Sequence, residues 1–103
     1  MIIIETWTGS WTPLNYKGYE EYLIHKGTHP GYGGYKYGFM FENGYGLLVC
    51  KHDCTWGNVD DLFEIATIDT NGDLILIEEI GKEVIGWLTN EEVIEYFEKI
   101  RRL

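Results

Sequence analysis

Residues 35–51 read YKYGFMFENGYGLLVCK, and this stretch decides the fold. Two apolar runs flank Asn43-Gly44, a pair that tolerates the positive φ angles of a two-residue type I′ hairpin turn. The stretch therefore predicts two antiparallel strands joined by a tight turn. Such a turn also sets the cross-strand neighbours. The expected pairs are Glu42 with Tyr45, Phe41 with Gly46, Phe39 with Leu48, and Tyr37 with Cys50.

Both faces of this hairpin are expected to be apolar, because side chains alternate along a strand. One face carries Phe39, Phe41 and Leu48, and the other carries Met40, Leu47 and Val49. A single helix covers only one face of a sheet. We therefore expect the N-terminal third of the chain, or a second subunit, to cover the other face.

The chain before the hairpin contains one expected strand and two less regular segments. Residues 2–8 alternate weakly and predict a strand. Residues 16–26, YKGYEEYLIHK, fit a short helix or turn that leads into an extended piece. Residues 27–34, GTHPGYGG, predict a loop because half of them are glycine.

The chain after the hairpin predicts a second hairpin and a helix. LFEIATID at 62–69 and LILIEE at 74–79 flank Asn71-Gly72, again a turn-forming pair. Thr89 and Glu92 have the spacing of a capping box at the start of a helix. An apolar stripe then follows at helical spacing. Its members are Val93, Tyr96, Phe97, Ile100 and Leu103.

These elements predict one α+β domain over residues 1–103. Its sheet is a mainly antiparallel four- or five-stranded meander, with the C-terminal helix packed on one face. The chain is 45% hydrophobic, and its longest apolar runs fall well short of the roughly 18 residues of a membrane span. The N-terminus lacks the basic flank of a signal peptide. We therefore expect a soluble cytoplasmic protein.

The net charge of −9 lies entirely in the second half of the chain. Residues 1–51 hold four carboxylates and four cations, whereas residues 52–103 hold thirteen carboxylates and four cations. This balance excludes a basic stripe and argues against direct nucleic-acid binding. The carboxylates either keep the protein soluble or form an acidic face that docks on a basic protein. The candidate face is Asp60, Asp61, Glu78, Glu79 and Glu83.

Three segments together carry a resemblance. Residues 84–100 (VIGWLTNEEVIEYFEKI), 41–49 (FENGYGLLV) and 62–69 (LFEIATID) resemble small uncharacterised proteins encoded by phages and prophages of Gram-positive bacteria. Those proteins similarly have an NGYG hairpin, an LFE-type strand and an IGWLTxEEV helix start. The similarity spans about residues 36–103. It implies a phage or prophage protein in a bacterial host cell, and it carries no activity or catalytic residue.

Cys50, His52 and Cys54 are the strongest candidate metal ligands. On an extended backbone they share a face, and His25 or His29 would be a fourth zinc ligand. The spacing between the cysteines and the lack of a second pair fit known structural zinc sites poorly. We therefore favour the interpretation that Cys50 packs opposite Tyr37 as a small hydrophobic residue and that no metal binds. No catalytic motif and no cofactor site emerge, so we expect a protein that is not an enzyme.

Aromatic residues are the remaining candidates for function. Trp7, Trp11 and Tyr32 lie in the neutral half, and such residues anchor protein interfaces when they are exposed. The leading hypothesis is therefore a phage or prophage accessory protein that binds another protein, such as a basic nucleic-acid-handling or defence factor of the host. One alternative is a small zinc module built on Cys50, His52 and Cys54. Another is a small-ligand-binding domain with the loop 27–34 as its lid.

Overall fold

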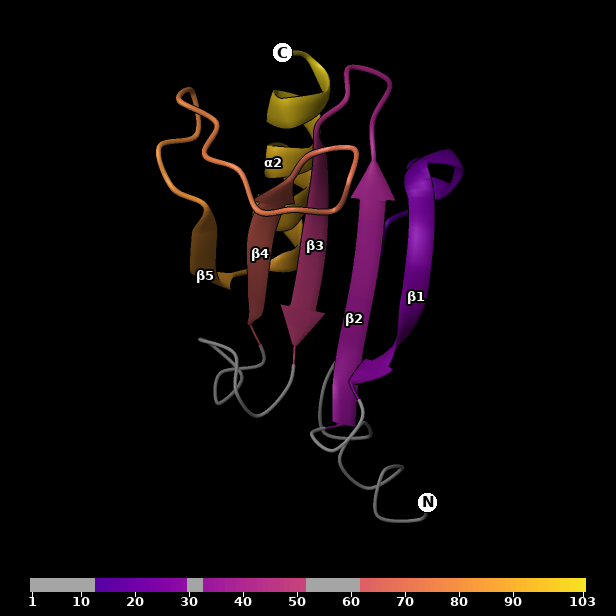
Figure 1. Cartoon of the computed structure of the whole chain (residues 1–103). Coiled ribbons are helices and arrows are strands. Elements are labelled where there is room, and N and C mark those ends of the chain that lie inside the picture. The colour runs from indigo at the N-terminus through magenta and orange to yellow at the C-terminus, as the bar shows by residue number, and fades with distance from the viewer. Residues whose placement is uncertain (1–12, 30–32, 52–61) are drawn as a thin grey trace.

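Figure 1 shows a twisted sheet with one long helix behind it. The computed structural model describes residues 13–29, 33–51 and 62–103, and the side chains of 13–27, 35–51 and 62–103. The described elements are η1 (Glu20–Tyr22), β1 (Leu23–His29), β2 (Gly33–Met40), β3 (Gly46–Lys51), β4 (Phe63–Ile68), β5 (Val84–Leu88) and α2 (Asn90–Arg101). The strands lie in sequence order and all pair antiparallel. The predicted α+β meander with a C-terminal helix is confirmed.

The central hairpin forms, but its predicted two-residue turn is wrong. Phe41 N donates to Tyr45 O at 2.9 Å, and Gly44 N donates to Phe41 O at 3.2 Å. These bonds close a three-residue loop in which only Gly44 takes a positive φ, of +88°. Asn43 does not take a positive φ, and its side chain bridges Tyr45 N and the end of α2. Three-residue loops with glycine in the left-handed position are the next most common hairpin connection after two-residue turns.

This extra loop residue shifts every cross-strand neighbour by one. The observed pairs are Met40 with Gly46, Phe39 with Leu47, Tyr37 with Val49, and Lys36 with Cys50. Leu47 and Val49 therefore lie on the face of Phe39 and Phe41, and Leu48 does not. The prediction that Cys50 packs opposite Tyr37 is wrong. A one-residue slip moves a side chain to the other face of a sheet.

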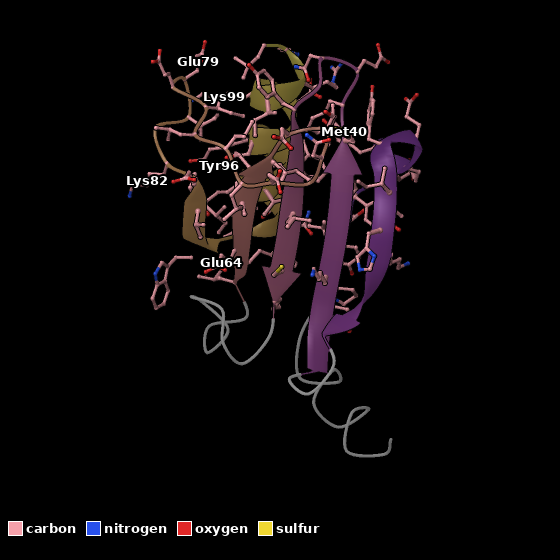
Figure 2. The ribbon with its side chains drawn as sticks, viewed as in Figure 1. Met40, Glu64, Glu79, Lys82, Tyr96 and Lys99 are labelled. Atoms are coloured by element: carbon pink, nitrogen blue, oxygen red, sulfur yellow. The ribbon has the colours of Figure 1, made fainter. Side chains whose placement is uncertain are left out.

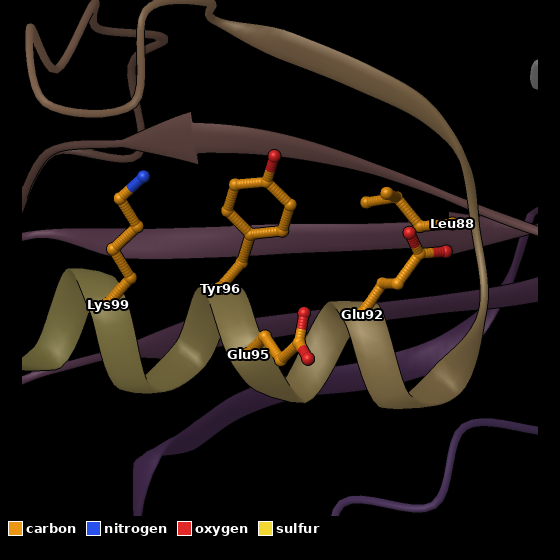
Figure 3. Close-up of a pocket in the computed structure, with 5 residues that line it drawn as sticks. All are labelled: Leu88, Glu92, Glu95, Tyr96 and Lys99. Atoms are coloured by element: carbon orange, nitrogen blue, oxygen red, sulfur yellow. The ribbon is translucent and has the colours of Figure 1, made fainter.

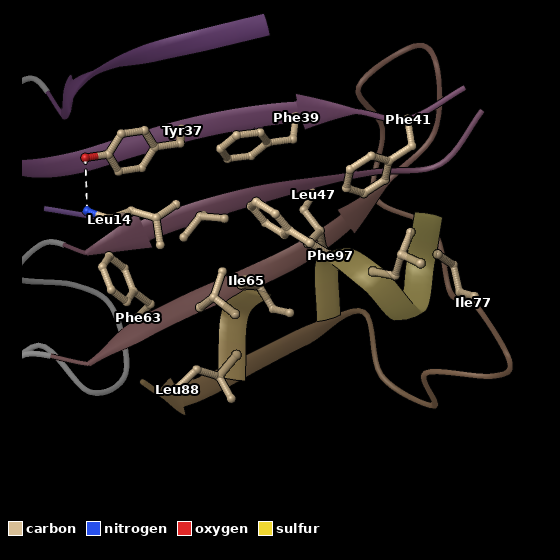
Figure 4. Close-up of a cluster of buried hydrophobic side chains, with 13 residues drawn as sticks. Leu14, Tyr37, Phe39, Phe41, Leu47, Phe63, Ile65, Ile77, Leu88 and Phe97 are labelled. Atoms are coloured by element: carbon tan, nitrogen blue, oxygen red, sulfur yellow. Dashed lines mark hydrogen bonds between the residues drawn. The ribbon is translucent and has the colours of Figure 1, made fainter. Parts of the chain in front are cut away.

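The core lies between the helix and one face of the sheet, as Figure 4 shows. Its members are Leu14, Tyr37, Phe39, Phe41, Leu47, Val49, Phe63, Ile65, Ile77, Leu88, Val93, Phe97 and Ile100. Phe97 of α2 has its ring centroid 4.5 Å from that of Phe39. We call the opposite side of the sheet the open face. Ile24 and Leu48 approach each other there over Gly38.

The second reversal is present, but the strand predicted at 74–79 is not. Asp69 N donates to Asp73 O, and Gly72 N to Asp69 O, each at 3.0 Å. Leu74 then makes only one isolated bridge, to Ile68. The chain leaves the sheet because Ile77 is buried in the core, and it returns as β5 to pair with β4. The sequence pattern did not predict β5 as a strand.

The helix begins as predicted. Glu92 N donates to Thr89 Oγ1 at 3.2 Å, and Thr89 N donates to Glu92 Oε1 at 2.9 Å, so the capping box is confirmed. Val93, Phe97 and Ile100 are buried as expected. Leu103 lies beyond the helix end and is exposed, so its place in the stripe is wrong. Within the described ranges, no helix is long and apolar enough to span a membrane.

The segment before the hairpin matches its prediction of a turn followed by an extended piece. Residues 16–22 form a turn and η1, and the chain then continues as β1. The predicted loop at 27–34 is shorter than expected, because β1 extends to His29 and β2 starts at Gly33. The strand predicted at residues 2–8 lies outside the described residues.

Candidate protein-binding surface

The edge strand β5 contains an irregularity that sets the direction of a tryptophan. Ile65 pairs with Ile85, but Phe63 pairs with Leu88, so Gly86 and Trp87 together oppose Glu64. This two-against-one arrangement is a β-bulge, a feature that redirects side chains and increases local twist. Trp87 is 56% exposed. The bulge therefore presents an indole ring to solvent at the rim of the sheet.

Trp87 also has an unusual backbone conformation. Its φ is +64°, and it is the only described residue other than glycine with a positive φ. A residue with a Cβ atom held in the left-handed region costs about 1–3 kcal/mol. The neighbouring Gly86 would adopt this conformation without that cost. Such strain clusters at functional sites, which makes Trp87 a candidate binding residue.

Two further exposed leucines follow β4: Leu74 bridges to Ile68 at the end of that strand, whereas Trp87 opposes Glu64 near its start. Leu74 is 53% exposed and Leu76 is 59% exposed. Both leucines belong to the segment that leaves β4, whereas Ile77 of the same segment is buried in the core. Together with Trp87, they account for three of the five large hydrophobic residues that are exposed in the described part of the chain. Exposed residues of this kind mark interaction sites when they gather in one region.

The predicted acidic residues Glu78, Glu79 and Glu83 lie in the connection between these leucines and β5, and all three are exposed. Figure 2 shows Glu79 and Lys82 on the β5 side of the molecule. None of the three glutamates forms an ion pair with another described residue. These three predicted site residues precede Trp87 by four to nine positions in the sequence. The other predicted site residues, Asp60, Asp61, Trp7, Trp11 and Tyr32, lie outside the described residues.

A shallow groove follows the flank of α2 next to β5, with a volume of about 230 Å³. Figure 3 shows its lining residues Leu88, Glu92, Glu95, Tyr96 and Lys99. The Tyr96 ring and the Lys99 chain rise from the helix on the same side. Glu92 is partly engaged by the capping box, whereas Glu95 has no ion-pair partner among the described residues. The lining of the groove thus combines two apolar or aromatic side chains with two carboxylates and one lysine.

The charges at the other end of α2 are already paired. Glu98 accepts hydrogen bonds from Arg101 and from Tyr19 Oη, the latter at 2.7 Å, and lies 3.1 Å from Arg102. The Arg101 and Tyr19 bonds lower the pKa of Glu98 to about 2. Burial, followed by the Glu98 bond, raises the pKa of Tyr19 to about 12. This cluster joins η1 to the helix, so it serves the fold.

The zinc alternative depends on a cysteine that lies on the open face. Burial raises the pKa of Cys50 to about 11, and Lys36 opposes that effect. A metal ligand must be a thiolate, so this environment works against binding in the absence of other ligands. No group of three potential metal-ligating side chains exists among the described residues. His52 and Cys54 lie outside them.

The small-ligand alternative has a hollow beside the glycine-rich segment. Its volume is about 460 Å³. The lining residues are Pro13, Leu14, Tyr16, Lys26, Gly27, Tyr35 and Tyr37. Lys26 Nζ lies 5.8 Å from the centre of the Tyr16 ring, and Tyr37 Oη accepts from Leu14 N. These polar groups already interact with one another, so few of them converge on the hollow in the way a specific ligand site requires.

Comparison with protein-family models, curated proteins and solved structures finds no match to this chain.

The sequence pattern does not indicate Trp87 or the groove as a candidate site. The run VIGWL has few alternating polar positions, so it does not reveal a strand edge. Gly86 is a weak sequence signal of the bulge, since glycine inside a strand pattern often marks one. Tyr96 was placed in the core stripe, yet it is only half-buried and lines the groove.

Proposed function

We propose that this protein is a non-enzymatic phage or prophage accessory protein that acts by binding another protein. The surface assigned to this role is the β5 side: Leu74, Leu76, Glu78, Glu79, Glu83 and Trp87. The resemblance of residues 41–49, 62–69 and 84–100 to phage-encoded proteins supports the origin. The exposed residues of this side support the mode of action.

The observation that carries the proposal is that one short segment holds both exposed apolar and exposed acidic residues. Between Leu74 and Trp87, three large hydrophobic side chains and three carboxylates are exposed. Carboxylates alone would only solubilise the protein. Protein interfaces combine an apolar anchor, often tryptophan, with a polar rim. The segment has both parts.

The charge of this segment indicates a basic partner. Complementary charges speed association and exclude partners of the same sign. A host protein that handles nucleic acid, or one that acts in defence by binding it, has a basic channel of the required sign. The protein described here would then compete with nucleic acid for the basic channel of its host partner. Direct binding of nucleic acid by this chain is disfavoured by its net charge of −9.

The test is capture of a host partner by cross-linking, with two matched charge-reversal variants. One variant changes Glu79 and Glu83 to lysine, and the control changes Glu21 and Glu42, which are also exposed, to lysine. Both variants alter the net charge equally. We expect the first to lose the partner and the second to retain it, with binding that weakens as salt rises. Equal capture by both variants at all salt concentrations would contradict an acidic docking surface.

The phage origin has its own test in the source genome. Genes flanking this one should encode phage functions such as replication, packaging or lysis. A conserved bacterial operon of metabolic genes around it would contradict the proposed origin, and the binding proposal would then stand on the surface alone.

A further inference from the structure

We propose that the partner contributes an extended segment bearing lysine or arginine, which adds to the free edge of β5 as a sixth strand. This inference rests on the proposed protein-binding function and deepens it by naming the binding mode. Strand addition uses the main-chain groups of an exposed sheet edge for affinity and side-chain pockets for specificity. Three features of the β5 side support it.

The first feature is an edge with open backbone groups. β5 pairs with β4 on one side and has no strand on its other side among the described elements. Thr67 N donates to Glu83 O at 3.0 Å, which fixes the alternation of the ladder. Ile85 therefore directs its backbone groups toward β4, and Val84 and Gly86 direct theirs outward. These outward groups are available to an added strand.

The second feature is the tryptophan beside those groups. Bulges commonly protect edge strands from pairing with another chain. The bulge at Gly86 and Trp87 would give that protection equally well with a small or charged residue at position 87. The chain instead has an exposed indole with a φ of +64°. Tryptophan is the residue type most enriched among those that dominate binding energy. Trp87 would cover one side chain of the incoming strand.

The third feature is the groove along α2. An added strand would lie about 4.8 Å beyond β5. That position is over the helix flank, because α2 packs against β3, β4 and β5 and the groove begins at Leu88. Inward side chains of the added strand would meet Leu88 and Tyr96, with Glu92 and Glu95 beside them.

Charge selects the occupant of this edge. The exposed carboxylates around it are Glu78, Glu79, Glu83, Glu91, Glu92 and Glu95, against the two cations Lys82 and Lys99. A second copy of this chain paired through β5 would bring like charges together, which is unfavourable across a sheet. A strand carrying lysine or arginine would meet opposite charges. The edge therefore favours a basic partner over a homodimer.

The test uses a short synthetic peptide that alternates lysine and valine, added to the full chain. Two control peptides replace lysine with glutamate, or carry N-methyl groups on alternate residues and so cannot pair as a strand. We expect only the unmodified basic peptide to bind in fluorescence anisotropy. Equal binding of the N-methylated peptide would show side-chain attraction without strand addition and would overturn the inference, as would no binding at all.

Variants of the edge give a second readout. Val84→Pro removes one outward N–H and leaves the ladder to β4 intact, whereas Val84→Thr keeps that N–H. We expect Val84→Pro to weaken peptide binding at least about tenfold and Val84→Thr to leave it nearly unchanged. Equal affinities, or a dimer through β5 in sedimentation experiments, would overturn the inference. If Val84→Pro fails to fold, the N-methylated peptide still decides.

The same variants separate this inference from the proposed function. In one outcome, lysine at positions 79 and 83 abolishes capture of the host partner, whereas Val84→Pro retains it. That outcome would support the acidic docking surface and contradict strand addition. A partner retained by both variants would remove both proposals.

Discussion

Asn90, the first residue of helix α2, exchanges two hydrogen bonds with the backbone of Asn15. Asn15 N donates to Asn90 Oδ1 at 2.7 Å, and Asn90 Nδ2 donates to Asn15 O at 2.9 Å. The side-chain amide thus pairs with the chain as a neighbouring strand would. The pair holds the segment before η1 against the helix start, and it places Leu14 in the core.

Asn90→Ala should lower the free energy of unfolding by about 1–2 kcal/mol, because two hydrogen bonds are lost. Urea denaturation followed by circular dichroism measures the change. Glu91→Ala is the matched control, since Glu91 is the exposed neighbour in the same helical turn. Equal stability of the two variants would mean that the Asn15 contact contributes nothing to the fold.

Asn43 holds the other end of α2. Its Nδ2 donates to Ile100 O at 2.7 Å, and its Oδ1 accepts from Tyr45 N at 3.1 Å. Asn43→Ala should therefore cost about 1–2 kcal/mol of stability. Asn71 occupies the same position of the second reversal without such a contact to the helix, so Asn71→Ala should cost less. The opposite order in urea denaturation would contradict the role assigned to Asn43.

The backbone strain at Trp87 predicts an inverted substitution order. In an ordinary strand, glycine is less stable than alanine by about 0.5–1 kcal/mol. At a φ of +64°, the Cβ atom of alanine is unfavourable, so Trp87→Gly should be more stable than Trp87→Ala by about 1 kcal/mol. Both variants lose the indole, so the difference in their stability reports the backbone strain at position 87. Alanine more stable than glycine in thermal unfolding would contradict the positive φ.

The thiol of Cys50 should react slowly at neutral pH. Burial raises its pKa to about 11, so little thiolate is present, and iodoacetamide alkylation should remain slow until the pH approaches that value. The raised pKa means that folding favours the protonated thiol. The thiol's contribution to the free energy of unfolding is therefore complete below pH 9 and is lost as the pH rises toward 11. A Cys54→Ser background isolates this thiol. Rapid alkylation near pH 7 would contradict the buried environment.

Much of the fold follows from the sequence, and its errors have physical causes. The capping box of Thr89 and Glu92 is a local pattern, and local patterns predict helix starts well. The predicted hairpin register was wrong because Asn-Gly fits both a two-residue turn and a three-residue loop that ends in glycine, and both reversals form the three-residue loop. The strand predicted at 74–79 after the second Asn-Gly turn is absent, because the segment leaves the sheet and places Ile77 in the core.

The candidate site was only partly predictable. Composition and charge indicated Glu78, Glu79 and Glu83 as candidates, since an uneven charge distribution can be counted along the chain, and the structure shows that all three are exposed. Trp87 was not found, because its importance comes from a bulge between β4 and β5 and from its φ angle. Both properties depend on strand pairing. The groove likewise forms only when α2 packs beside β5.

The most direct measurement is an NMR titration of the full chain with the lysine–valine peptide. The sheet offers an internal control, because β1 is the other edge of the meander. We expect the largest amide shifts at Val84 and Gly86, a shift of the Trp87 indole N–H, and slower hydrogen exchange at the two outward amides of β5. Shifts concentrated on β1, or spread evenly over all acidic residues without protection of β5, would contradict binding at the β5 edge.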